Sequence, residues 1–146
     1  MIDEDREDLK RFITKQLEYF YTALEEIEHG MKVSHWIWFI FPQLKELSRS
    51  PTAIYYGIKD PGEARRFIGN DYLHCNLVTI SNALLKHEGK DIERIMGDID
   101  ALKLRFCMTL FSCVSGEKVF TDVLNAFYDS KKDEMTLDLL GIERSV

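Results

Sequence analysis

The chain has 146 residues, of which 45% are hydrophobic and 30% charged, and its formal net charge is −6. This length suits one domain, and we expect residues 1–146 to form a single one. The acidic balance argues against a general nucleic-acid-binding protein, which usually carries a basic surplus or stripe. No apolar stretch approaches the roughly 20 residues that span a bilayer, and no signal-peptide pattern opens the chain. We therefore expect a cytoplasmic protein that binds neither nucleic acid nor membranes.

The first element predicted from the sequence is a long helix. Apolar residues recur at steps of three and four from Leu9 to Ile27, a spacing typical of one buried helical face. Gly30 suits the left-handed position that ends a helix, because it has no Cβ to clash there. We expect the helix to stop at His29–Gly30.

Residues 34–43, SHWIWFIFPQ, contain both tryptophans of the chain. Positions 36–41 are all apolar, so periodicity cannot distinguish a buried strand from a buried helix. Because no alternating segments elsewhere could supply partner strands, we interpret the window as a short helix. The Ser34 hydroxyl is the expected cap, and the helix should end just before Pro42, since the residue preceding a proline avoids the α region.

Two clear helix starts follow this window. Ser50–Pro51 and Asp60–Pro61 each place a capping side chain before a proline at the first helical position. Glu63 follows Asp60 at the spacing of a capping box. Apolar residues then mark one face of a longer helix over residues 73–84.

The remaining third of the chain is also predicted to be helical. A short turn of helix is expected within residues 91–97, and Asp98 can cap the helix that follows. Ten of the fourteen residues 101–114 are apolar, which is typical of a helix at the centre of a bundle. An amphipathic helix over residues 119–127 and a short one after Thr136 complete the pattern. The fold class is all-α, an irregular bundle of about seven or eight helices.

His35 is the best single candidate for a reactive side chain. An imidazole titrates near neutral pH, and burial shifts its pKa easily. A general base normally needs a partner that orients it, and the sequence offers only Ser34 beside it. The alternative is a core histidine that donates to a backbone carbonyl.

Trp36 and Trp38 are the candidate aromatic wall of a site. On a helix, side chains two positions apart point about 200° from each other, so the two indoles cannot form a sandwich. One could face the core while the other lines a cleft and stacks on a base or a cation. The alternative is that both are packing residues.

Lys103 and Arg105 are unusual because they lie in an otherwise apolar helix. A cation buried without a partner is costly, and two residues this far apart lie on different faces. One could extend to solvent, while the other pairs with a carboxylate such as Asp98 or Asp100, or with an anionic ligand such as phosphate.

The sequence contains no familiar catalytic or metal-binding pattern. HExxH and paired-cysteine spacings are missing, so no metal site is predicted. The GxSxG, GxxxxGK[ST] and GxGxxG motifs are missing as well. We therefore predict no catalytic residue, and the sequence leaves the cofactor unknown.

The SHWIWFIFPQ motif resembles a family of small, mostly bacterial proteins catalogued as domain of unknown function 1810. The resemblance extends over nearly the whole chain. Besides the motif it is carried by Arg11–Phe12, Gln16, Gly30, Lys32, 49–53, 63–65, 102–105, 108–111 and Thr136–Leu137. It implies an all-helical fold, and no catalytic residue can be carried over from it.

Two hypotheses about function follow from these residues. The first is a pocket for a small anionic ligand, such as a nucleotide or a phosphorylated metabolite, in which an indole stacks and a cation takes the negative charge. Its candidate residues are His35, Trp36, Trp38, Gln43, Lys103 and Arg105. The second is a protein–protein interaction or oligomerisation module without chemistry, in which the aromatic segment is core or the face of a homodimer.

Overall fold

The computed structural model describes residues 4–142, and these residues are helical without any named strand. The all-α prediction is confirmed. The elements in chain order are α1 (Glu4–Glu28), α2 (Ile37–Ile40), the 3-10 turn η1 (Lys45–Leu47), α3 (Pro51–Tyr56), α4 (Pro61–Gly69), α5 (Asp71–Leu85), α6 (Ile92–Met96), α7 (Asp98–Ser115), α8 (Lys118–Phe127) and α9 (Glu134–Leu140).

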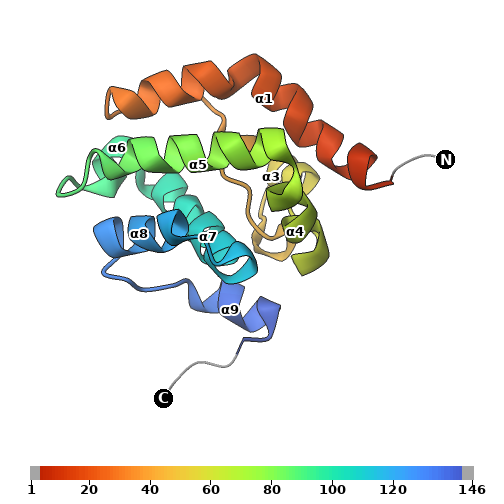
Figure 1. Cartoon of the computed structure of the whole chain (residues 1–146). Coiled ribbons are helices and arrows are strands. Elements are labelled where there is room, and N and C mark those ends of the chain that lie inside the picture. The colour runs from red at the N-terminus through yellow and green to blue at the C-terminus, as the bar shows by residue number, and fades with distance from the viewer. Residues whose placement is uncertain (1–3, 143–146) are drawn as a thin grey trace.

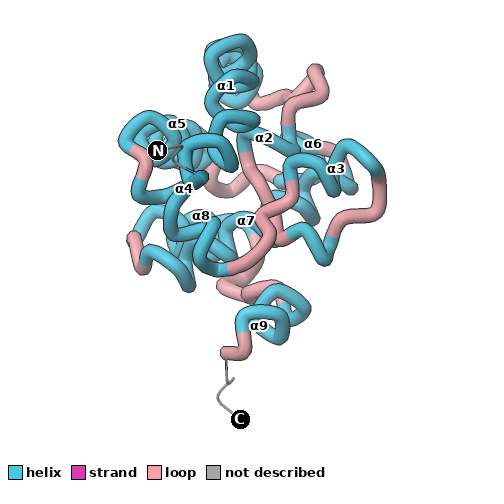
Figure 2. The backbone as a smooth tube through the Cα atoms, turned by 90° about the vertical axis from the view of Figure 1, so that its right-hand side faces the viewer, coloured by secondary structure: helices cyan, strands magenta, loops and turns pink. Residues whose placement is uncertain are grey.

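The helices are arranged around α7. Helix α1 lies along one side of the molecule, where it packs on α5, α2 and α4, and α7 contacts α8, α6, α4, α9 and α2 (Figure 1). A view turned by 90° shows α1 and α9 at opposite ends, with α7 and α8 between them (Figure 2). A site built on α2 and the start of α7 is therefore separated from one built on α9.

The apolar α7 occupies the centre, as its composition predicted. Five of its apolar side chains have essentially no exposed surface, and they are Leu104, Cys107, Met108, Leu110 and Phe111. The ring of Phe111 contacts Phe67 of α4 at 5.3 Å and Phe120 of α8 at 6.0 Å between centroids. Rings at these separations add favourable edge and tilted contacts to the hydrophobic burial.

Several predicted helix ends are confirmed. The Ser50 hydroxyl accepts the Ala53 N–H at 3.1 Å, and the Asp60 carboxylate accepts the Glu63 N–H at 2.8 Å. Gly30 has a φ of +79°, just beyond the end of α1. Asp98 does not cap α7; Gly97 takes that position, with a φ of +86° that side-chain-bearing residues rarely adopt.

The predicted start of α2 is wrong. The helix begins at Ile37, and the Ser34 hydroxyl donates to Glu26 of α1 at 2.6 Å instead of capping the helix. A hydrogen bond to a charged carboxylate is stronger than one to a neutral cap partner, which explains the preference. The helix ends at Ile40, before Pro42, as expected.

A buried ion pair joins α1 to α4. The Glu63 side chain is 2% exposed, and Arg11 donates to its two carboxylate oxygens at 3.0 and 3.3 Å. Arg11 also donates to the carbonyls of Tyr55 and Gly57, both at 3.0 Å. The Glu63 carboxylate additionally accepts the Lys59 N–H at 2.9 Å. This geometry fixes the end of α3 and the start of α4 against α1.

Candidate functional site

Trp36 lies in the core and cannot contact a ligand. Its side chain has no exposed surface, and its indole N–H donates to Glu26 at 3.0 Å. The Lys32 ammonium lies 4.7 Å from the indole ring centroid, inside the protein. Trp36 is therefore a packing residue, and Trp38 is the indole that remains a candidate for the wall of a pocket.

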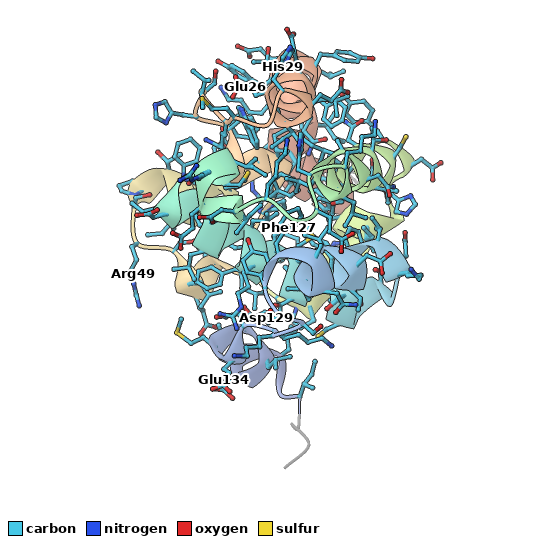
Figure 3. All side chains as sticks on the ribbon, turned by 90° about the vertical axis from the view of Figure 1, so that its left-hand side faces the viewer. Glu26, His29, Arg49, Phe127, Asp129 and Glu134 are labelled. Atoms are coloured by element: carbon cyan, nitrogen blue, oxygen red, sulfur yellow. The ribbon has the colours of Figure 1, made fainter. Side chains whose placement is uncertain are left out.

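Glu26 holds the segment that leads to Trp36. Its carboxylate accepts hydrogen bonds from the Val33 N–H (2.7 Å), the Ser34 N–H (2.8 Å), the Ser34 hydroxyl and the Trp36 indole. Burial acts to raise the pKa of Glu26, but the hydrogen bonds from these three residues outweigh it and lower the pKa to about 2. Figure 3 shows Glu26 on α1, at the end of the molecule opposite Glu134.

Lys32 ties the same segment to α7. Its ammonium lies 2.7 Å from the Asp100 carboxylate and donates to the Ser34 carbonyl at 2.5 Å, and its side chain is only 5% exposed. Asp100 thus pairs with Lys32, and neither Lys103 nor Arg105 has the carboxylate partner that we considered among Asp98 and Asp100. The contact places residues 32–34 beside the first turn of α7.

The structure brings four of the six candidate residues together, and we call His35, Trp38, Gln43 and Lys103 the Trp38 site. Trp38, Gln43 and Lys103 line one pocket. The Lys103 ammonium lies 5.6 Å from the Trp38 ring centroid, within the range of a cation–π contact. The His35 ring is stacked on Trp38 with centroids 6.5 Å apart and planes inclined by 29°. The other lining residues are Ile37, Phe41, Ala53 and Tyr56.

His35 is exposed, so the alternative of a core histidine is wrong. Within the described part of the chain no hydrogen bond orients its imidazole, which a general base would need. Among residues 4–142, no three histidine, cysteine or acidic side chains are grouped so that they could hold a metal ion. His35 is therefore an exposed member of the Trp38 site that stacks on the Trp38 ring.

Two polar atoms in the pocket wall are buried without a partner in the structure. They are the Trp38 indole nitrogen and the Gln43 side-chain oxygen, and Gln43 is only 7% exposed. The pocket holds about 10 Å³ of free space, which is the room that one water molecule requires. An unsatisfied buried donor or acceptor costs roughly 1–3 kcal/mol.

Arg105 lies elsewhere and has a structural partner. Its guanidinium donates to the carbonyls of Lys131 (2.8 Å) and Lys132 (3.0 Å) in the loop between α8 and α9. Figure 3 shows Asp129, at the start of this loop, and Glu134 of α9 toward the end opposite Glu26. Lys103 and Arg105 do not open onto one cavity, in agreement with the different faces that their spacing predicted.

Sequence reasoning missed the two charged residues that hold this region. Glu26 reads as one more acid on the polar side of α1, and no pattern connects it to a segment eight residues later. Lys32 precedes the aromatic motif and is part of the resemblance, which is the one signal that pointed to it. Ala53 and Tyr56 reach the pocket only because α3 packs on α2.

The fold and this region together define a class: an all-helical protein in which an aromatic segment spans the space between α1 and α7 and leaves one indole at the surface. The family model described as "Protein of unknown function (DUF1810)" matches residues 6–140. The chain belongs to this family.

A solved structure has the same fold. It is the crystal structure of the conserved hypothetical protein Rv1873 from Mycobacterium tuberculosis, which is 36% identical in sequence and has a TM-score of 0.89. The similarity covers 93% of this chain and 98% of the other. A comparison with curated proteins gave no match. Within residues 4–142 no helix has the length and apolar character that crossing a membrane requires.

Proposed function

We propose that the protein binds a small anionic ligand at the Trp38 site. The observation that carries this proposal is that Trp38, Gln43 and Lys103 line one pocket, and that the Trp38 N–H and the Gln43 side-chain oxygen are buried without a partner. The pocket itself is small, so the body of the ligand would rest outside it, against the Trp38 ring, His35 and Lys103.

The charge of the ligand follows from Lys103. Its side chain is half-buried over the Trp38 ring, and within the described residues it has no carboxylate partner. A lysine ammonium is a compact cation that binds phosphate or carboxylate groups. An indole face beside it can stack on a planar group of the same ligand. Nucleotides and phosphorylated metabolites combine these features.

Thermal unfolding with three probes tests the proposal: inorganic phosphate, glycerol 3-phosphate and AMP. A probe that binds the native state stabilises it in proportion to the logarithm of its concentration. We expect at least one probe to raise the melting temperature with this logarithmic dependence on concentration, and Lys103→Met to abolish the rise. Lys131→Gln, at an exposed lysine near α9, is the matched control and should keep it. If no probe has an effect, or the effect survives Lys103→Met, the proposal is wrong.

A second candidate function is self-association beside this site. Val33, Ile99 and Leu102 are 73%, 71% and 48% exposed. The Lys32–Asp100 ion pair joins the segment that contains Val33 to the first turn of α7, which contains Ile99. The exposed apolar side chains therefore lie around this ion pair. Such a group of side chains is typical of an interaction face.

The oligomeric state tests the second candidate. Native mass spectrometry or sedimentation should show a dimer that Ile99→Asp converts to a monomer. Leu17→Asp, at a residue of α1 that is 69% exposed, is the control and should leave the dimer intact. A wild-type protein that remains monomeric over the accessible concentrations rules this candidate out.

A further inference from the structure

The residues that line the Trp38 pocket include one buried donor and one buried acceptor, and the pocket has space for a single non-hydrogen atom. The donor is the Trp38 indole N–H and the acceptor is the Gln43 side-chain oxygen, and both lack a partner. The orientation of the Gln43 amide decides which chemical group can bond to both atoms. Gln43 offers an acceptor if its oxygen is the free atom, and a donor if its nitrogen is.

A chain of hydrogen bonds sets the orientation of this amide. Gln43 donates through its amide nitrogen to the Ser48 hydroxyl at 3.3 Å, and that hydroxyl donates to the Ala53 carbonyl at 3.0 Å. The Ala53 carbonyl needs this donor, because the Gly57 N–H bonds to Ile54 at 3.1 Å. Since the single Ser48 proton is used, Ser48 can only accept from Gln43. The amide oxygen is therefore the Gln43 atom that is left without a partner.

The backbone around Gln43 is also held in place. The Ile58 N–H donates to the Gln43 carbonyl at 2.8 Å, and the Lys45 N–H donates to the Ile58 carbonyl at 2.7 Å. Gly57 permits this close pairing, because a Cβ there would lie 2.5 Å from the Lys45 Cα. An acceptor on so constrained a segment is pre-organised and selects its partner strongly.

We infer that the ligand carries a hydroxyl group, which enters the pocket, in addition to its anionic group. A hydroxyl accepts from Trp38 and donates to Gln43 through one oxygen atom. A carbonyl or an ionised phosphate oxygen cannot donate, and an ammonium cannot accept. The inference rests on the proposed function and names its ligand class: a hydroxylated phosphate or a hydroxycarboxylate.

Two matched pairs of probes test the hydroxyl. Glycerol 3-phosphate is compared with propyl phosphate, and lactate with propionate, so that charge stays the same within each pair and the arms distinguish phosphate from carboxylate. Dissociation constants are measured by isothermal titration calorimetry. In at least one pair we expect the probe with the hydroxyl to bind about tenfold or more tightly than the probe without it. The probe without a hydroxyl leaves the Trp38 N–H and the Gln43 oxygen unpaired.

Variants then assign the preference to the pocket atoms. Gln43→Met removes the acceptor, and the ratio of the two dissociation constants should fall toward one. Trp38→Phe keeps an aromatic ring but removes the N–H, and should lower the same ratio even if Gln43→Met fails to fold. Ser48→Ala releases the amide to rotate, and we expect it to weaken the preference while Gln43 is still present.

The outcomes separate this inference from the proposed function. If the members of each pair bind equally well, the pocket holds only a water, and the hydroxyl inference is wrong although anion binding stands. If no probe of either pair binds and the nucleotide and phosphate probes also fail, both are wrong. A hydroxyl preference that survives both Gln43→Met and Trp38→Phe also overturns the inference.

Discussion

At the scale of single residues, Glu26 shows how one carboxylate can hold a whole segment in place through hydrogen bonds. Four donors of residues 33–36 converge on it. Its pKa is about 2 in the folded protein, against an ordinary value of 4.5. A lowered folded-state pKa adds stability that is present above the unfolded value and is lost as the pH falls toward the folded value.

We therefore expect the free energy of unfolding to fall between pH 4.5 and about 2, in part through Glu26. Glu26→Gln should cost roughly 1–3 kcal/mol at neutral pH, because bonds to a charged acceptor are replaced by weaker ones. It should also flatten the decline below pH 4.5. Urea unfolding across this range measures both effects. Glu28→Gln, at an exposed acid of the same helix, is the control; an equal effect of the two changes would contradict the role of Glu26.

The two tryptophans should respond differently to truncation. Trp36 is fully buried and hydrogen-bonded, so Trp36→Ala should destabilise the protein by about 3–5 kcal/mol. Trp38 is half-buried, so Trp38→Ala should cost clearly less and act mainly on ligand binding. Chemical denaturation of both variants measures the difference. Equal losses of stability would mean that Trp38 is also a core residue.

At the scale of elements, the helix ends show which local signals survive tertiary packing. Ser50 and Asp60 cap α3 and α4 as their proline-flanked positions predicted. Ser34 has the same capping chemistry, but the Glu26 carboxylate takes its hydroxyl. A local signal therefore holds unless a charged group from another element competes for it.

Gly57 provides a prediction at the junction of α3 and α4. A Cβ at this position would lie 2.5 Å from the Lys45 Cα, so Gly57→Ala must push residues 43–45 away from Ile58. We expect a loss of about 1–3 kcal/mol, the usual range for overpacking, and weaker binding at the Trp38 site. Gly69→Ala is the control, because nothing lies within 4 Å of its Cβ position. If Gly57→Ala is as stable as the control, the segments are not held as closely as described.

At the scale of the whole molecule, Arg105 connects the central helix to the last one. Its two hydrogen bonds to residues 131 and 132 are joined by one from the Asp133 N–H to the Thr109 hydroxyl at 2.9 Å. Both contacts run from α7 to the segment before α9. The Trp38 site is built without any of these residues.

Arg105→Gln should therefore loosen α9 without changing the Trp38 site. We expect faster amide hydrogen exchange over residues 131–140, because local opening depends on the contacts that hold a segment. Exchange in α1 and α5 should stay as in the wild type, and so should the response to the anionic probes. A loss of probe binding in Arg105→Gln would show that the two ends of the molecule are coupled after all.

Much of the fold was readable from local patterns, for physical reasons that particular residues illustrate. The steps of three and four along α1 mark its buried face, and the apolar residues around Leu104 predict a helix surrounded by others. Pro42 restricts the backbone of the residue before it, and Gly30 adopts the left-handed conformation beyond the end of α1 because it has no Cβ. These features act over a few residues, so the sequence alone determined the all-helical class and the confirmed helix ends. The SHWIWFIFPQ motif determined the family.

The tertiary structure decided everything that depends on residues far apart in the chain. The spacing of Trp36 and Trp38 predicts opposite directions, but only the position of α1 buries Trp36 and leaves Trp38 beside Lys103. Likewise, the partner of Arg105 is a pair of backbone carbonyls 26 and 27 residues away. Carbonyl groups are present at every residue and leave no mark in the sequence. Local periodicity determines which elements form, whereas the packing of those elements determines which polar atoms meet.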